Sequence, residues 1–159
     1  MEIDFTNLAR YKIEKIFFEK IAHTIQELEK IKGDFSLGVI LVGQARMRNI
    51  NKRYAGKNKV TDVLSFSFSE IKKETKKELK YIGSRSGSQM MGEIFLCPSR
   101  IKKQSRRLKR NFLEELTSVF IHGMMHLLGY DHIKNYEAEK MKKREESFLK
   151  ILERELLKR

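Results

Sequence analysis

Apolar residues recur along the chain with two different spacings, and these spacings predict both helices and strands. Residues 11–31 carry apolar side chains three and four positions apart, which is the pattern of an amphipathic helix with one buried face. Residues 35–42 form a short run rich in valine, isoleucine and leucine between glycines, as is typical of a buried strand. The same reasoning predicts strands at residues 1–6, 35–42, 63–68 and 93–97, and helices at residues 11–31, 44–54, 99–109, 112–128 and 135–157.

Particular residues mark the ends of two of these helices. Pro98, the only proline, suits the first turn of a helix. Asn111 with Glu114 three residues further on forms a capping-box pattern for the helix at residues 112–128. Gly129 is expected to end that helix, because glycine readily adopts the left-handed conformation of a helix end.

The composition of residues 70–90 differs from that of the rest of the chain. Lysines dominate the first half of this segment, and glycines and serines the second. Such a composition is typical of a flexible, solvated loop, and we do not take it as a domain boundary. With 159 residues, the chain fits a single domain, residues 1–159, that carries this loop as an insertion.

Neither secretion nor membrane insertion is indicated by the sequence. The N-terminus, MEIDFTN, lacks the basic start and the apolar stretch of a signal peptide. The longest apolar run, residues 119–128, is too short to span a bilayer. Cys97 is the single cysteine, so the chain needs no oxidising compartment. We therefore expect a cytoplasmic protein with no membrane partner and no obligate protein partner.

The net charge is strongly positive. There are 34 lysines and arginines against 21 aspartates and glutamates, a formal charge of +13, which favours a polyanionic partner, with nucleic acid ahead of an anionic membrane. A charge run on a single helix is by itself most often a solvated face, but the net charge here favours contact with phosphates. The candidate RNA-binding residues form one stretch without an acidic neighbour: Lys102, Lys103, Arg106, Arg107, Lys109 and Arg110.

Three of the four histidines lie in one segment, HGMMHLLGYDH, at residues 122–132. On a helix, His122 and His126 project from one face about one turn apart, and a turn at Gly129 brings His132 back toward them. Three imidazoles with a fourth position open describe a catalytic zinc site, although imidazole also suits nickel, copper and iron. The sequence therefore predicts one metal ion per chain, zinc by default, held by these three histidines.

Gly123 separates this segment from the zinc proteases. The spacing of the histidines matches the metzincin pattern HExxHxxGxxH, but Gly123 occupies the position of the glutamate. Because that glutamate is the general base of the proteases, its absence disfavours ordinary peptide hydrolysis and leaves the metal ligands in place. A zinc metallopeptidase is therefore a disfavoured alternative.

The segment HGMMHLLGYDH closely resembles the HGxLHLxGYDH signature of the YbeY family of bacterial ribosomal RNA maturation endoribonucleases. The resemblance extends to TDVLSF at residues 61–66, to residues 92–94 and to Ala138, Glu139 and Met141, and it covers essentially the whole chain. It implies an α+β fold: a small mixed sheet of about four strands packed by about five helices, with a zincin-like metal-binding helix at one end of a cleft. It also implies action on ribosomal RNA, with the ribosomal subunit as the partner.

The same resemblance draws attention to two further positions. Ala55 stands where the family has an arginine considered important for activity, and Lys57 lies beyond Gly56, where its long side chain can swing toward the cleft.

Asp131, adjacent to His132, could orient a ligand imidazole or simply stabilise the turn. The candidate catalytic residues are His122, Asp131 and Lys57.

With the histidine cluster and the positive charge, the resemblance implies a zinc-dependent endoribonuclease specific for single-stranded RNA, acting in ribosomal RNA maturation and ribosome quality control. Two alternatives stay open: the zinc metallopeptidase, and a non-catalytic RNA-binding protein of ribosome assembly in which the metal is structural. No motif selects the nucleophile, which could be a hydroxide held by the metal or the adjacent ribose hydroxyl.

Overall fold

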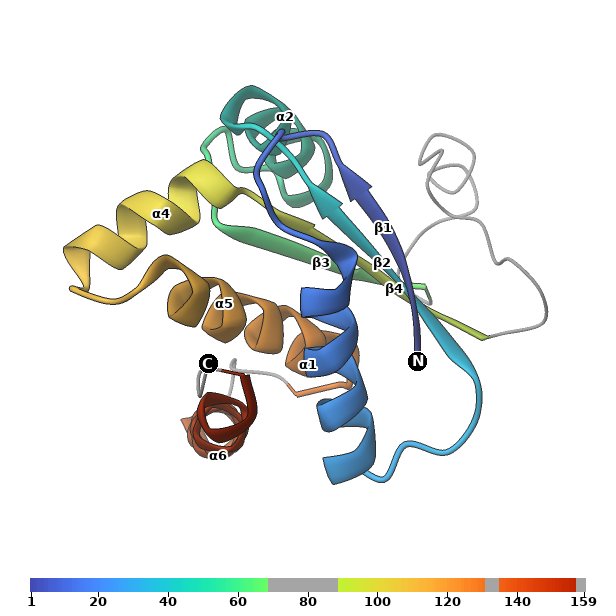
Figure 1. The fold of residues 1–159 in the computed structure, drawn as a ribbon. Helices are drawn as coiled ribbons and strands as arrows, with labels where there is room; N and C mark the ends of the chain where they lie inside the picture. Colours follow the sequence, from blue (N-terminus) through green and yellow to red (C-terminus); the bar gives the residue numbers. More distant parts are fainter. Residues whose placement is uncertain (69–88, 131–134, 157–159) are drawn as a thin grey trace.

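The computed structural model describes residues 1–68, 89–130 and 135–156, whose arrangement is drawn in Figure 1. These residues form an α+β fold of four strands and five helices, as the sequence predicts. In chain order the elements are β1 (Glu2–Asn7), α1 (Lys15–Leu28), β2 (Phe35–Leu41), α2 (Gln44–Ala55), β3 (Val63–Ser67), β4 (Gln89–Leu96), α4 (Pro98–Arg107), α5 (Phe112–Leu127) and α6 (Asn135–Leu156).

The four strands form one mixed sheet in the order β1-β2-β4-β3. β1 pairs with β2 and β2 with β4 in parallel, whereas β3 runs antiparallel to β4. β3 therefore lies at one edge of the sheet, next to the strand that follows it in the chain. This edge becomes one wall of the candidate site.

Helices cover both faces of the sheet, and each face has its own apolar cluster. On one face α1, α4 and α5 pack against the sheet, and rings such as Phe18 and Phe120 meet at 5.0 Å between their centroids. On the other face α2 packs its buried Met47 beside Ile40 and Phe95. α6 lies outside α5 in Figure 1 and contributes Met141, Phe148 and Leu152 to the first cluster. α5 is thus buried between the sheet and α6.

The predicted helix ends agree with the structure. Pro98 occupies the first turn of α4. The Asn111 side chain accepts a hydrogen bond from the backbone N–H of Leu113, and the Glu114 carboxylate accepts one from the backbone N–H of Asn111, so the capping box at the start of α5 is formed. Gly129 follows the end of α5 with a φ of 91°, which favours glycine.

Three predicted boundaries were wrong by three residues or more. The helix expected to end at residue 31 ends at Leu28, because Lys30 takes the left-handed conformation with a φ of 52° and the backbone N–H of Ile31 donates to the Gln26 carbonyl. The helix expected over residues 11–31 begins only at Lys15, because the Tyr11 carbonyl accepts hydrogen bonds from the Asn7 side chain and the Ile13 backbone, which makes a turn there. The strand expected at residues 93–97 begins at Gln89, because its first residues pair with β2. Residues 89 and 90 are therefore strand and not loop, and the rest of the predicted loop, residues 69–88, lies outside the described residues.

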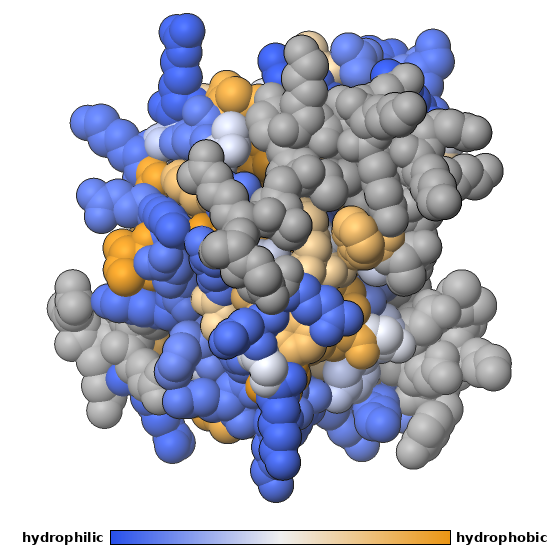
Figure 2. Space-filling model, turned by 90° about the vertical axis from the view of Figure 1, so that its right-hand side faces the viewer, coloured by the Kyte–Doolittle hydropathy of each residue, from blue (hydrophilic) through white to orange (hydrophobic). Residues whose placement is uncertain are grey.

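No described helix is both long and apolar enough to cross a membrane. The molecular face in Figure 2 agrees with the charged composition: hydrophilic residues make up most of its coloured surface, and hydrophobic residues show only as patches between them.

Candidate metal centre

His122 and His126 lie together on α5, as their spacing predicts. Their Nε2 atoms are 3.0 Å apart, and their rings are nearly perpendicular, at 81°, with centroids separated by 4.6 Å. α5 is helical through both residues, so the four-residue spacing places both rings on one face. The two Nε2 atoms therefore lie within hydrogen-bond distance of one another.

The pair borders a cleft of about 270 Å³ between α5 and the edge strand β3. The cleft is lined by Val63, Leu64, Ser65, His122, His126 and Leu127. Ser65 lies two positions after Val63 on β3, so both side chains share the face of the sheet that is turned toward α5. The cleft thus brings two imidazoles and a hydroxyl to one place, with apolar walls around them.

Glu145 of α6 contacts the ring of His122 on the side opposite His126. Its Oε1 atom lies 2.7 Å from Nδ1 of His122, the ring nitrogen on the side away from His126. The Glu145 side chain is only 18% exposed, so this hydrogen bond is largely shielded from water. The hydrogen bond raises the pKa of His122 above its usual value, against the opposing effect of burial, and the negative charges of Glu145 and Asp62 add to the rise.

The sequence predicts a helix at residues 135–157 but assigns Glu145 no part in the site. One pattern in the sequence could have found it. Met141 and Phe148, four residues before and three residues after Glu145, lie on the buried stripe of α6, so a carboxylate at position 145 is carried on the same face. A charged residue on an apolar stripe indicates a specific partner.

The described residues fit a metal ion of the predicted kind. Neighbouring nitrogen ligands of a tetrahedral zinc are about 3.3 Å apart when each Zn–N bond is about 2.0 Å, a few tenths of an ångström more than the separation of 3.0 Å seen here. A metal-bound histidine usually donates its other ring N–H to a carboxylate, as His122 can donate to Glu145. The third predicted ligand, His132, and the candidate Asp131 lie outside the described residues. Residues 1–68, 89–130 and 135–156 contain no group of three potential ligands among themselves.

Gly123 faces the sheet and not the cleft. A Cβ atom added at Gly123 would lie 3.1 Å from Ile94 Cγ2 and 3.3 Å from Val63 Cγ2, both tighter than ordinary contacts. A glutamate at this position would have to enter the packed interface between α5 and the strands. The glycine is therefore explained by the close approach of α5 to the sheet, which brings β3 near the histidines.

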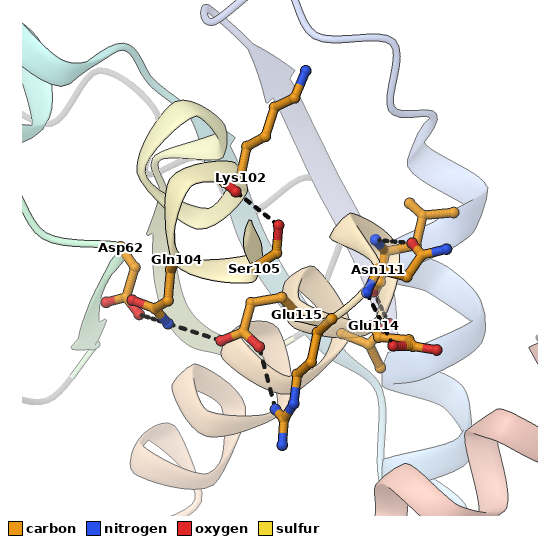
Figure 3. A network of polar contacts seen from close by, with 10 residues as sticks. Asp62, Lys102, Gln104, Ser105, Asn111, Glu114 and Glu115 are labelled. Carbon is orange, nitrogen blue, oxygen red and sulfur yellow. Dashed lines mark hydrogen bonds and ion pairs between the residues drawn. The ribbon is translucent and has the colours of Figure 1, made fainter. Parts of the chain in front are cut away.

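A chain of polar contacts holds the start of β3 against α4 and α5 (Figure 3). Gln104 donates to Asp62 Oδ2 at 3.2 Å and to Glu115 Oε1 at 2.8 Å. Arg110 completes the chain with an ion pair to Glu115 Oε2 at 3.2 Å. Glu115 is only 3% exposed, so these donors satisfy a buried carboxylate, and its role is structural. The chain fixes the position of β3 relative to α5 and with it the walls of the cleft.

The predicted RNA-binding cations are all exposed on and directly after α4. Arg110 is the exception in its contacts, because it makes the ion pair with Glu115, which is buried. The other five are Lys102, Lys103, Arg106, Arg107 and Lys109. α4 itself packs beside α5, the helix that carries the histidine pair.

Lys57 lies just beyond the end of α2, as predicted. α2 continues through Ala55, and Gly56 ends it in the left-handed conformation with a φ of 69°. Arg53 is on the helix, with its guanidinium over the ring of Tyr54 at 5.5 Å. Lys57 is exposed and does not line the cleft, so its catalytic role stays a prediction.

The fold and the cleft together define an α+β protein with a histidine pair at the edge of its sheet. The family model described as "Endoribonuclease YbeY" matches residues 3–153. An endoribonuclease YbeY of Clostridium botulinum is 34% identical over 151 residues, covering 89% of this chain and 91% of that protein. One of Thermodesulfovibrio yellowstonii is 38% identical over 117 residues, 73% of this chain and 66% of that protein.

Solved structures agree with these sequence matches. A solution structure of a Thermotoga maritima protein superposes with a TM-score of 0.62 at 26% identity, covering 96% of this chain and 90% of that one. The chain belongs to the YbeY endoribonuclease family. The family membership predicted from the HGMMHLLGYDH segment is thereby confirmed.

Proposed function

We propose that the protein is a zinc-dependent endoribonuclease that cleaves single-stranded RNA in ribosomal RNA maturation and ribosome quality control, with the ribosomal subunit as its partner. The observation that carries the proposal is the histidine pair in the cleft of a chain that belongs to the YbeY family. The relatives named above are endoribonucleases by name, and the net charge of +13 suits an RNA substrate.

One zinc ion per chain is proposed to be held by His122, His126 and His132. With zinc bound, these residues would hold a Lewis acid that could polarise a phosphoryl oxygen and stabilise the charge that develops during cleavage. His122 is fixed by the hydrogen bond from its Nδ1 to Glu145, which leaves the Nε2 lone pair toward the cleft. Asp131, adjacent to His132 in the sequence, is proposed to orient a metal-binding imidazole.

The cleft explains how a phosphodiester could be positioned. Its lining residues combine the histidines with Ser65, whose hydroxyl can donate to a phosphate oxygen. The strand that carries Ser65 is held in place from behind by the hydrogen bond between Asp62 and Gln104. Lys57 is proposed to supply the positive charge of the family arginine that Ala55 replaces. A lysine acts as a point charge and cannot form the two parallel hydrogen bonds that an arginine makes to a phosphate.

The cations of α4 are proposed to bind the RNA backbone away from the cleft. Each is exposed, and α4 packs on the histidine-bearing helix, so a strand of RNA that crosses the cleft can continue onto α4. Contacts of this kind neutralise phosphates and carry no sequence information. In this proposal the cations of α4 bind and orient the RNA, and the residues of the cleft take part in its cleavage.

The packing at Gly123 speaks against the zinc metallopeptidase. The proteases with this histidine spacing need a glutamate there, and a Cβ atom added at Gly123 would point into the interface with Ile94 and Val63. No described residue of the cleft lining carries a carboxylate that could replace it as a general base.

Two measurements on purified protein test the proposal. Elemental analysis is expected to find one zinc per wild-type chain and far less in folded His126→Ala, whereas His23→Ala, a change at an exposed residue of α1, keeps the metal. Zinc-loaded protein is expected to cleave single-stranded RNA and to leave casein intact. Cleavage of casein would favour the peptidase, and no cleavage of RNA by metal-replete protein would favour the RNA-binding protein with a structural metal.

A further inference from the structure

Glu145 lies on a different helix from the histidine that it contacts. His122 belongs to α5 and Glu145 to α6, 23 residues further along the chain, and the two atoms that meet are 2.7 Å apart. The contact is partly buried, since the side chains of His122 and Glu145 are 39% and 18% exposed. A close, shielded contact between helices is formed only if both helices are held in one relative position.

We propose that Glu145 is a positioning residue of the metal site: its carboxylate holds the ring of His122 so that Nε2 faces the metal. The inference rests on the proposed metal site and names the residue that prepares it. A carboxylate that accepts the Nδ1 proton selects the tautomer whose Nε2 carries the lone pair, and the lone pair is what a metal needs. The carboxylate also makes the ring more basic and so a stronger ligand.

The rest of α6 is anchored in a way that fixes Glu145. Arg144, the preceding residue, donates from Nε to Glu29 Oε1 at 2.5 Å and from Nη2 to the Leu28 carbonyl at 3.3 Å, both at the end of α1. The Arg144 guanidinium also lies over the ring of Phe148, 5.1 Å from its centroid. α6 is thereby held in one register against α1 while the neighbouring residue reaches α5.

Glu29 also holds the chain on the other side of the site. Tyr130, directly after the turn at Gly129, donates from its hydroxyl to Glu29 Oε2 at 3.1 Å. The two oxygens of this carboxylate therefore bind one residue after α5 and one residue of α6. This shared anchor fixes α6, and with it Glu145, relative to the end of α5.

The zinc dissociation constant, measured by competition with a chromophoric chelator, tests the inference. Glu145→Ala is expected to raise this constant by about tenfold to a hundredfold, as for other residues that hydrogen-bond a metal-binding histidine. Glu145→Gln keeps an oxygen that can accept from Nδ1, so it is expected to raise the constant by less, because a neutral acceptor makes a weaker hydrogen bond. Glu146→Ala, at the adjacent exposed residue, is the matched control and is expected to bind zinc as the wild type does.

A spectroscopic readout separates positioning from general damage to the fold. The visible absorption of bound cobalt(II) is expected to change in Glu145→Ala and to return toward the wild-type spectrum in Glu145→Gln. If Glu145→Ala bound zinc as tightly as the wild type, or if the Ala and Gln variants weakened binding equally, Glu145 would not position His122, and the proposed function would stand. If the wild type itself bound no metal, the proposed function would fall together with this inference.

Discussion

Glu93 on β4 is a buried carboxylate whose ionisation should cost the protein stability. The side chain is fully buried, and neither of its oxygens has a hydrogen-bond partner among the residues that the structure describes. Gly38 lies directly opposite on β2, where a Cβ atom would come within 2.9 Å of Glu93 Cγ, so the glycine makes room for the carboxylate. Burial raises the pKa of Glu93 from 4.5 to about 7, and the charge of Asp4 adds to the rise.

The size and the sign of the effect follow from this pKa. Between pH 4.5 and about 7 the folded protein keeps a proton that the unfolded chain has lost, so the free energy of unfolding falls as the pH rises through this window. At about 1.4 kcal/mol per pH unit, the difference between the two pKa values corresponds to about 3 kcal/mol, and the loss is complete above the folded pKa of about 7. Glutamine has a similar shape and does not ionise.

Urea unfolding of the wild type and of Glu93→Gln at pH 5 and pH 8 measures this difference. We expect the variant to be more stable at pH 8 by up to about 3 kcal/mol and to differ far less at pH 5. Glu146→Gln, at an exposed residue of α6, is the control and should change little at either pH. A stability difference between Glu93→Gln and the wild type that is the same at both pH values would refute the reasoning.

Three further predictions concern the site and its surroundings. Gly123→Glu should lower the free energy of unfolding by about 3–5 kcal/mol in urea, because the carboxylate would be forced against Ile94 without a partner; a fully stable variant would contradict the packing argument. Charge reversal at both Arg106 and Arg107 should reduce the log–log salt slope of single-stranded RNA binding by about 1.4, at about 0.7 per lost phosphate contact; an unchanged slope would place the RNA elsewhere. Lys57→Ala should slow RNA cleavage by about tenfold or more at unchanged zinc content, as expected for a lost contact to a charged phosphate, and an unchanged rate would remove this lysine from the site.

Structural features that depend on residues close in sequence could be predicted from local patterns. Features that depend on contacts between distant residues could not. The capping box at Asn111 and the turn at Gly129 involve residues close in sequence, so both could be predicted. The start of β4 could not, because Gln89 joins the strand only through its pairing with Phe35 of β2. The sheet order depends in the same way on contacts between segments far apart in the chain.

The same distinction between local patterns and distant contacts holds for the residues of the candidate site. The placement of His122 and His126 on one face follows from helical geometry and a spacing of four residues, so the sequence alone predicted it. The contact with Glu145 depends on how α6 packs on α5, and the reason for Gly123 depends on how closely α5 approaches the strands. Both are properties of packing between elements, which no local pattern in a single sequence specifies.

Cleavage of single-stranded RNA by metal-depleted protein, before and after zinc is added back, tests the central claim most directly. The wild type is expected to lose cleavage on depletion and to regain it with about one equivalent of zinc, as the three-histidine site predicts. Folded His126→Ala is expected to stay inactive at the same zinc concentration. Full cleavage by the depleted wild type, or recovery of cleavage in His126→Ala to the wild-type rate, would contradict the account.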